Sequence, residues 1–481
     1  MAPISLADLA TGPVSPSDTV KALKSYTKHP NLLHSLPFPI AKDGKPNAVH
    51  SKGIYWYLED GSVLMDAGSS GVAVTCIGMG IPEVFDAIDK QMRKTAFVYH
   101  AYLSCPPAAE LADYLLAKSD GAFQKATFFC SGSEAIEAAL KLSFNYWRNK
   151  GQPQRRHFIS REYSYHGNTF GAMQLGDSAR SHFYRPLWEE SSTFHKVSSG
   201  GYLRDKREGE TEEEFSERMS QELEAKILSL GPDTVMAFCA ETVNGGIMAA
   251  VAPPKGYFPA ISRVLKKYDI LLVMDEVLCG MGRVGTLHAW QTVGEGVRPD
   301  IQPIAKGLGG GYMPISGVLV NHKVSEVLGE GMVHAHTYQE HPVACAAALA
   351  VQKYVFDHDL LANNRLRGAQ LLTLLKEGLD HLEYVRDVRG TGCLLGIEFE
   401  PFYFNPKAKP RFAPRLSAAG RINGVLLTNL SGNQDFNYGE GCYLAPAFTL
   451  TEDETNLMAE LVIKSIKDAH QSYIDDYPKT V

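Results

Sequence analysis

Short apolar runs alternate with stretches of helical character between about residue 105 and residue 345. Three of these runs occupy residues 127–129, 235–238 and 270–274, and each ends beside small or polar residues. Runs of this length bounded by turn-forming residues are typical of strands buried on both faces. Strands that alternate with helices predict an α/β protein with a largely parallel sheet, in which ligands collect at the carboxyl ends of the strands.

Two other stretches have the period of an amphipathic helix. Each begins with the pattern of a capping box, Thr211 with Glu214 and Thr451 with Glu454. The apolar positions are Phe215, Met219, Leu223 and Ile227 in the first stretch and Met458, Leu461, Val462 and Ile466 in the second. We expect the first to be a surface helix without chemistry and the second to be the final helix.

The composition is that of a globular protein. The chain has 481 residues, of which 44% are hydrophobic, and this size suggests two or three domains. The net charge of -7, without a block of lysine and arginine, argues against a nucleic-acid partner. The eight cysteines form no C-x-x-C pair, which favours reduced thiols inside a cell. No membrane span, signal peptide or transit peptide is evident, so we expect a cytoplasmic protein.

Candidate chemistry begins with Asp275, at the end of the apolar run 270–274, and Lys306, just before a glycine run. A lysine amine can form a Schiff base with the aldehyde of pyridoxal phosphate (PLP). A carboxylate can keep the pyridine nitrogen protonated, so that the ring withdraws electrons. The pair therefore suggests PLP chemistry.

Two other functions compete for the same stretch. A magnesium-binding strand of a P-loop ATPase would require G-x-x-x-x-G-K-[ST], and the nearest candidate fails because Gly44-Lys45 is followed by Pro46. The residues from Gly280 to Gly285 match G-x-G-x-x-G, the dinucleotide fingerprint, with Asp300 downstream. That fingerprint should join a strand directly to a helix, and here the apolar run ends at Met274.

A phosphate site is suggested where the strand at 127–129 meets a helix. Ser131, Gly132 and Ser133 combine free backbone N–H groups, two hydroxyls and a glycine that permits close approach. Ser131 and Glu134 also match the pattern of a capping box, and the same residues can both cap the helix and bind a phosphate.

Three further candidate sites do not identify a function on their own. Tyr165, followed by His166, offers a ring on which a planar cofactor could stack, and Glu241 is an acid at the end of a predicted strand. His334 and His336 raise the question of a metal, but a helical run begins directly after Pro342, and we predict no metal site.

Together these blocks resemble class III (ω-type) aminotransferases of PLP fold type I. The blocks are 131–135, 165–167, Glu241, 275–277 with 280–285, 305–307 with 310–312, and 336–338, and they cover about residues 50–465. The resemblance implies a large PLP-binding domain over residues 79–345, with a mostly parallel central sheet and helices on both faces. A smaller α+β domain would combine residues 1–78 and 346–481.

The resemblance also implies roles. Lys306 would hold PLP and move the proton between substrate and cofactor, and Asp275 would pair with the pyridine nitrogen. Val277 and Tyr165 would cover the two ring faces. The remaining cofactor contacts would come from Ser131, Gly132, Ser133, His166, Glu241, Asn244 and Thr337. Thr337 would reach the phosphate of a neighbouring subunit's cofactor, which implies a homodimer with the active site at the subunit interface.

The chain departs from the family pattern at three places. Thr242 and Asn244 replace a proline and a glutamine that many members carry after Glu241. No arginine stands near Thr428, where many members bind a substrate carboxylate, and Arg415 and Arg421 are near in sequence only. Residues 67–73 are small and neutral, which suggests a roomy pocket.

We therefore expect a PLP-dependent transaminase that moves an amino group from an amine or ω-amino acid to an oxo acid or aldehyde by a ping-pong mechanism. The alternatives are a decarboxylase, racemase or aminomutase of the same family, or an NAD-dependent oxidoreductase using residues 280–285.

Overall fold

The computed structural model describes residues 46–188, 193–400, 412–430 and 440–477. Its largest sheet has seven strands in the order β4-β10-β9-β8-β7-β5-β6. These strands are β4 (Lys125–Phe129), β5 (His157–Arg161), β6 (Phe194–Val197), β7 (Val235–Glu241), β8 (Leu271–Asp275), β9 (Ile301–Ile304) and β10 (Ser316–Val320). Neighbouring strands from β6 to β9 pair in parallel, whereas β10 runs antiparallel to both β9 and β4. The expected sheet is therefore present, with one reversed strand.

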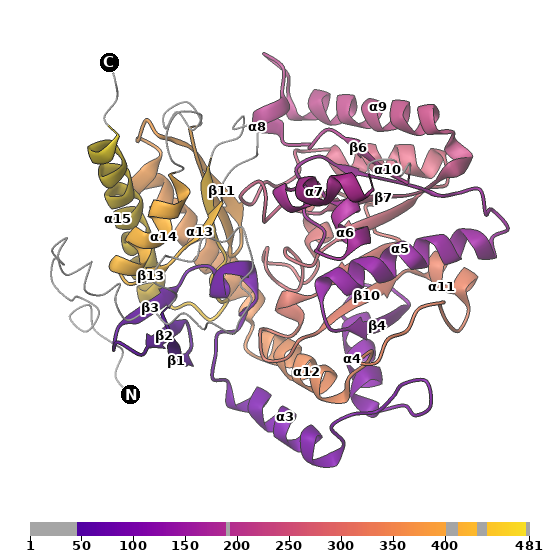
Figure 1. The fold of residues 1–481 in the computed structure, drawn as a ribbon, viewed down its shortest axis with the longest axis horizontal. Helices are drawn as coiled ribbons and strands as arrows, with labels where there is room; N and C mark the ends of the chain where they lie inside the picture. Colours follow the sequence, from indigo (N-terminus) through magenta and orange to yellow (C-terminus); the bar gives the residue numbers. More distant parts are fainter. Residues whose placement is uncertain (1–45, 189–192, 401–411, 431–439, 478–481) are drawn as a thin grey trace.

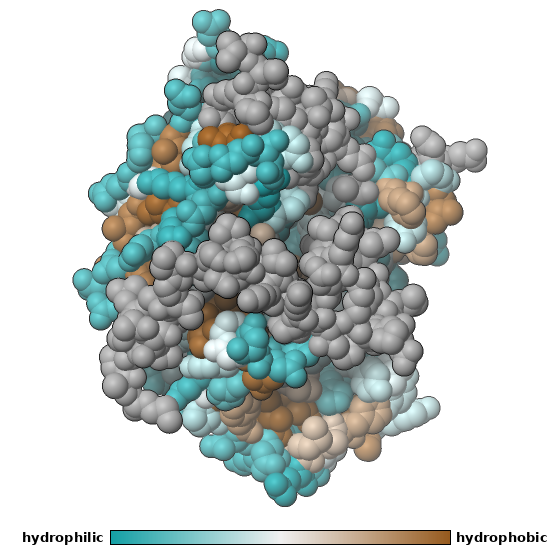
Figure 2. All heavy atoms as spheres, turned by 60° about the vertical axis from the view of Figure 1, so that its left-hand side comes forward, coloured by the Kyte–Doolittle hydropathy of each residue, from teal (hydrophilic) through white to brown (hydrophobic). Residues whose placement is uncertain are grey.

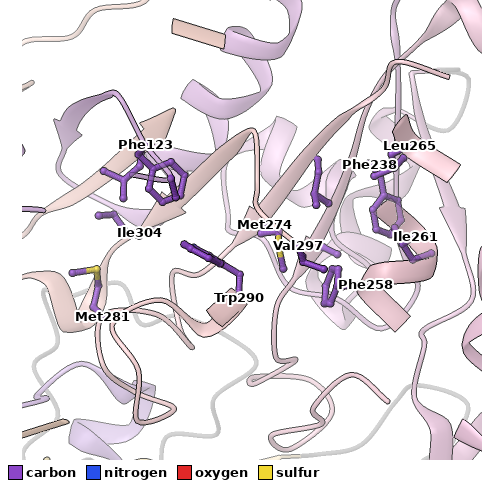
Figure 3. Close-up of a cluster of buried hydrophobic side chains, with 14 of the residues drawn as sticks. Phe123, Phe238, Phe258, Ile261, Leu265, Met274, Met281, Trp290, Val297 and Ile304 are labelled. Carbon is purple, nitrogen blue, oxygen red and sulfur yellow. The ribbon is translucent and has the colours of Figure 1, made fainter. Parts of the chain in front are cut away.

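Both faces of this sheet are buried. In β8, Leu272 and Met274 pack into one apolar cluster, and Leu271 and Val273 pack into another on the opposite face. Side chains of a strand alternate between faces, so an unbroken apolar run requires a cover on each side. Figure 3 shows part of the first cluster, where Met274 lies near Val297 and Trp290.

Helices supply these two covers (Figure 1). The helix α5 (Gly132–Asn149) contributes to the cluster on one face, and α9 (Glu212–Leu230) and α10 (Tyr257–Lys267) contribute to the cluster on the other. The other helices around this sheet are α3 (Pro82–Lys94), α4 (Pro106–Ala117), α6 (Phe170–Leu175), α7 (Ala179–Tyr184), α8 (Tyr202–Asp205), α11 (His322–Leu328) and α12 (Pro342–Asp357). The chain thus has the α/β architecture that the alternating pattern predicted.

A second group of elements lies to the left in Figure 1. One sheet has the order β1-β2-β3-β13 and another the order β11-β12-β15-β14. The strands are β1 (Ala48–Lys52), β2 (Tyr55–Leu58), β3 (Val63–Asp66), β11 (Val385–Thr391), β12 (Leu394–Phe399), β13 (Val425–Leu426), β14 (Thr428–Leu430) and β15 (Gly441–Leu444). The helices are α13 (Leu360–Leu379), α14 (Ala413–Ile422) and α15 (Glu452–Asp476). Because β3 pairs with β13, strands from both ends of the described chain share a sheet.

Both amphipathic helices are confirmed. Thr211 and Thr451 cap α9 and α15, each with the reciprocal bond of a capping box. The α9 residues at the predicted apolar positions are buried, whereas Leu461 of α15 is only partly buried. Where the side carrying α15 is coloured in Figure 2, hydrophilic residues predominate. None of the helices in the described ranges has the length and apolar character needed to span a membrane.

Candidate active site

A cavity of about 390 Å³ opens at the carboxyl ends of the parallel strands. Lining residues follow β4, β5 and β9, and Glu241 and Asp275 end β7 and β8. Parallel strands bring their carboxyl ends to one edge, which is why residues far apart in the sequence meet here.

Asp275 and His166 form a buried pair within this cavity. His166 Nδ1 lies 2.7 Å from Asp275 Oδ2, and the backbone N–H of Val277 donates to Asp275 Oδ1 at 2.9 Å. His166 Nε2 is buried and has no hydrogen-bond partner among the described residues. The imidazole therefore fixes the orientation of the carboxylate that faces the cavity.

Lys306 follows β9 and opens a short 3-10 helix (Lys306–Leu308). Its backbone has φ of 44°, in the left-handed region. The backbone N–H groups of Gly309 and Gly310 both donate to the Lys306 carbonyl oxygen, which closes the turn. Burial lowers the pKa of the Lys306 amine, and the charges of Asp275 and Glu241 oppose this effect. A lowered pKa makes the neutral amine accessible, and the neutral amine is the form that attacks an aldehyde or accepts a proton.

Glu241 lies between two backbone donors. Its carboxylate accepts from Tyr165 N at 3.1 Å and from Gly245 N at 3.2 Å. Burial raises the pKa of the Glu241 carboxyl, and the nearby His166 counteracts part of this rise. The acid thus shapes the loop that carries Tyr165 and also contributes charge to the cavity.

Asn244 is placed differently from the other predicted contacts. It is not among the residues that line the cavity, and its side chain donates to Tyr163 O at 2.7 Å and accepts from Met248 N at 2.9 Å. Thr242, the other departure in this block, donates to Glu276 Oε1 at 3.0 Å. Both substituted side chains are committed to contacts within the protein.

The block at the start of α5 forms a cradle. Ser131 caps the helix, with reciprocal bonds to Glu134, so the capping-box interpretation is correct. A Cβ atom added at Gly132 would lie 2.8 Å from Val277 Cγ1, so a side chain at this position would enter the space beside Val277. Ser133 Oγ accepts from Asn168 N at 2.9 Å. Backbone N–H groups at a helix N-terminus, with a hydroxyl beside them, suit an anion.

Tyr165 and Val277 also line the cavity, on two different loops. The Tyr165 hydroxyl accepts a hydrogen bond from Arg180 Nη1 at 3.3 Å. Sequence reasoning missed Arg180, which lies outside every recognised block, and it missed the lining residues Val74, Leu278 and Met313. Leu278 follows Asp275 and Val277 directly, and this proximity was the available signal.

Thr337 is exposed and does not line the cavity of its own chain. Beside it, Cys130, Glu134 and His336 form the one group of potential metal ligands found among the described residues, with ligand atoms within 4.8 Å of one another. Glu134 Oε2 already accepts from the backbone N–H groups of Cys130 and Ser131.

The stretch from Gly280 to Gly285 does not have the geometry of a dinucleotide site. It is a loop that opens no helix, since the next element is a short 3-10 helix (Ala289–Thr292), and a Cβ at Gly282 would meet Phe448 at 2.8 Å. Arg283 within it is 1% exposed and donates to the carbonyl oxygens of Cys393, Ala445 and Pro446. Close packing explains these glycines, so the structure gives the nicotinamide alternative no support.

The family model described as aminotransferase class-III matches residues 41–466. The chain belongs to the class III aminotransferase family. This membership confirms a PLP-dependent transaminase of fold type I, as the order of the sequence blocks predicted.

Relatives and solved structures agree with this family. An uncharacterized aminotransferase of Schizosaccharomyces pombe is 40% identical over 431 residues, which cover 88% of this chain and 92% of that protein. A gamma aminobutyrate transaminase of Solanum lycopersicum is 34% identical, with 88% and 91% coverage. The structure of an omega transaminase from Pseudomonas jessenii in complex with PMP is 28% identical, covers 95% of this chain and 98% of its own, and has a TM-score of 0.82.

Arg415, which is near Thr428 in the sequence, does not line the cavity of this class III aminotransferase. Arg415 donates to Ser472 and forms an ion pair with Asp476 on α15, at 2.7 Å. Arg415 is therefore committed to packing between α14 and α15.

Proposed function

We propose that this transaminase transfers the amino group of an amine or ω-amino acid to an oxo acid or aldehyde by a ping-pong mechanism. The observation that carries the proposal is the placement of Lys306, Asp275 and the Gly132 cradle around one cavity. Each of the three matches a different part of PLP: the aldehyde, the pyridine nitrogen and the phosphate.

The residues present fit this cofactor. A Cβ at Gly132 would crowd Val277 Cγ1 at 2.8 Å, and glycine keeps this space open beside the backbone N–H groups that suit a phosphate. Gly132, Ser133 and the Ser131 cap would hold the phosphate, and Tyr165 and Val277 would cover the ring. Glu241 would lie beside it. Asn244 has no part in this proposal because its side chain bonds elsewhere.

When bound, PLP supplies an electron-withdrawing ring that stabilises negative charge at the substrate carbon. Asp275 would hold a proton on the pyridine nitrogen, with His166 fixing the orientation of the carboxylate. Lys306 would carry the cofactor and then, as a free amine, take a proton from the substrate carbon and return one. Its lowered pKa favours this exchange near neutral pH.

We further propose that the active unit is a homodimer. Tyr102, Leu103, Val333 and Tyr338 are 85%, 68%, 85% and 55% exposed, which is unusual for large apolar residues. Thr337 directly precedes Tyr338 and would reach the phosphate of the neighbouring subunit's cofactor. Sedimentation at micromolar concentration should give twice the mass of one chain, and a monomer with full activity would contradict this proposal.

A cytoplasmic location and the division into domains at residues 78 and 345 also remain proposals. The eight cysteines are free, which accords with a reducing compartment. The sheet that joins β3 to β13 supports a small domain built from both ends of the chain.

The test is amino transfer by the purified, PLP-loaded protein. With 1-phenylethylamine and pyruvate, alanine and acetophenone should form in equal amounts, and Lys306→Ala should abolish transfer. Lys266→Ala, at an exposed lysine, is the matched control. Transfer that persists in Lys306→Ala would overturn the assignment. An amine or amino acid that is converted without an oxo acid over many turnovers, rather than once per bound PLP, would favour the decarboxylase, racemase or aminomutase alternative.

A further inference from the structure

Cys130, Glu134 and His336 bring three kinds of metal ligand together at the edge of the cavity. Their ligand atoms, one from each side chain, lie within 4.8 Å of one another. Cys130 follows β4 and lines the cavity, Glu134 lies in the first turn of α5, and His336 belongs to the segment between α11 and α12 (Figure 1). A thiolate, an imidazole and a carboxylate are ligands of zinc, whereas magnesium and calcium take oxygen ligands.

The His336 ring has a nitrogen that the protein leaves unused. Nε2 is buried and has no hydrogen-bond partner among the described residues. The ring packs against Phe129 of β4, with the ring centroids 5.5 Å apart, which places the imidazole beside the end of that strand. A buried polar atom without a partner is unfavourable, and a bound metal ion would supply the missing partner.

Glu134 and Cys130 are held in place but are not saturated. Glu134 Oε2 accepts from the backbone N–H groups of Cys130 and Ser131, both at 2.8 Å, and these bonds leave Oε1 available to a cation. The Cys130 thiol donates only a weak hydrogen bond, to Tyr338 O at 3.8 Å. Burial and the charge of Glu134 raise the pKa of this thiol, because a thiolate here would lie near a carboxylate. A divalent cation would attract both groups.

We propose that Cys130, Glu134 and His336 bind a divalent transition metal of the zinc type, with water as the fourth ligand. The ligand atoms of a tetrahedral zinc site lie about 3.3–3.8 Å apart, so small side-chain rotations complete a site whose atoms are already within 4.8 Å. The metal replaces the proton of the Cys130 thiol, which passes to the solvent, and no electron is transferred. The histidine spacing alone predicted no metal site, because Cys130 and Glu134 are distant from His336 in the sequence.

A metal at this place would join two parts of the cofactor site. The cradle residues from Ser131 to Ser133 lie between Cys130 and Glu134, and Thr337 directly follows His336. The metal would therefore restrain the segment at 336–338 against the start of α5, and its positive charge would favour an anion in the cradle. Metal binding goes beyond the proposed transaminase function and does not depend on it.

Calorimetric titration of the tag-free, PLP-loaded protein with Zn²⁺ tests the site. We expect one zinc ion per chain, without competition from Mg²⁺ in about 100-fold excess. In Cys130→Ser and in His336→Gln the affinity for zinc should fall by about 100-fold or more, because each variant loses a ligand. Glu134→Gln can still complete the capping box, and it should lose about tenfold. The PLP absorbance band shows that each variant is folded.

Titration with Cd²⁺ provides a second measurement, because a cadmium-bound thiolate absorbs in the ultraviolet. The new band should appear in wild type and in the control Cys105→Ser, at a half-buried cysteine, but not in Cys130→Ser. His50→Gln, at an exposed histidine, is the control for His336→Gln. Wild-type zinc affinity in Cys130→Ser or His336→Gln would overturn the proposal, and so would a wild type that binds no zinc. Failure of the proposed function looks different, because amino transfer would be absent while these binding results stood.

Discussion

The stretch that follows β8 serves two purposes. Asp275, Val277, Leu278 and Cys279 line the cavity, whereas Gly280 to Gly285 pack against the C-terminal elements. Near the first part, Lys306 Nζ makes no side-chain hydrogen bond within the described residues, and His166 Nε2 has no partner there. In the second part, Arg283 donates to three carbonyl oxygens and to Ser69 Oγ. A buried charge saturated by the protein maintains structure, whereas polar groups left incompletely paired are available to a ligand.

The largest expected effect is on chemistry. Asp275→Asn keeps the shape of the side chain but removes the charge that holds a proton on the pyridine nitrogen. We expect the rate of the half-reaction to fall by about 10³-fold or more, while the thermal unfolding midpoint changes by less than about 4 °C. Stopped-flow absorbance and calorimetry measure the two quantities, with exposed Asp86→Asn as control. A large loss of stability without a loss of rate would show that Asp275 has a structural role, and would contradict the division of this stretch into a catalytic and a structural part.

Arg283→Met should have the opposite profile. Removing the guanidinium takes one donor from the buried carbonyl oxygens of Cys393, Ala445 and Pro446, of which Ala445 O keeps its bond from Ser69 Oγ, so we expect a loss of about 3 kcal/mol in the free energy of unfolding. Urea unfolding checks this value. Exposed Arg263, paired with Glu217, is the control, and Arg263→Met should cost less than about 1 kcal/mol. Equal effects of the two substitutions would contradict a structural role for Arg283.

Much of this division could be predicted from sequence. The apolar run before Asp275 predicted β8, the capping boxes predicted α9 and α15, and the order of the motif blocks predicted the family. The reversed direction of β10 and the pairing of β3 with β13 could not be predicted, because both depend on contacts between residues distant in sequence.

Parts of the site were also beyond sequence reasoning. Asn244 matched a cofactor position in a known block, yet its amide bonds to Tyr163 O and Met248 N, which a motif comparison does not reveal. Arg180 belongs to no block, and its relation to Tyr165 follows from the way Asp177 joins a loop to α7.

A smaller effect is expected in the cradle. In Gly132→Ala, the new Cβ would lie 2.8 Å from Val277 Cγ1, and we expect about tenfold weaker binding of PLP, measured by fluorescence titration of the apoprotein. Adding Val277→Ala in the same chain should restore part of the affinity. Wild-type affinity in Gly132→Ala would show that the cradle does not approach the cofactor.

The smallest effect concerns His288, in the structural loop after Gly285. Burial lowers the pKa of His288 to about 3 from an ordinary value of 6.5. Below pH 6.5 the unfolded chain therefore takes up a proton that the folded chain refuses, so His288 makes the free energy of unfolding fall as pH decreases toward 3. In His288→Gln this slope should be smaller by up to about 1.4 kcal/mol per pH unit. Urea unfolding from pH 5 to 7, with exposed His322→Gln as control, measures the slope, and identical slopes would contradict a buried neutral imidazole.

The central claim is that Lys306 carries the cofactor. The chain offers an internal rival, because burial also lowers the pKa of Lys196 to about 7. Borohydride reduction of the PLP-loaded protein, followed by peptide mass spectrometry, should place the pyridoxyl group on Lys306 and leave Lys196 unmodified. A pyridoxyl group on Lys196, or on no lysine at all, would contradict the account.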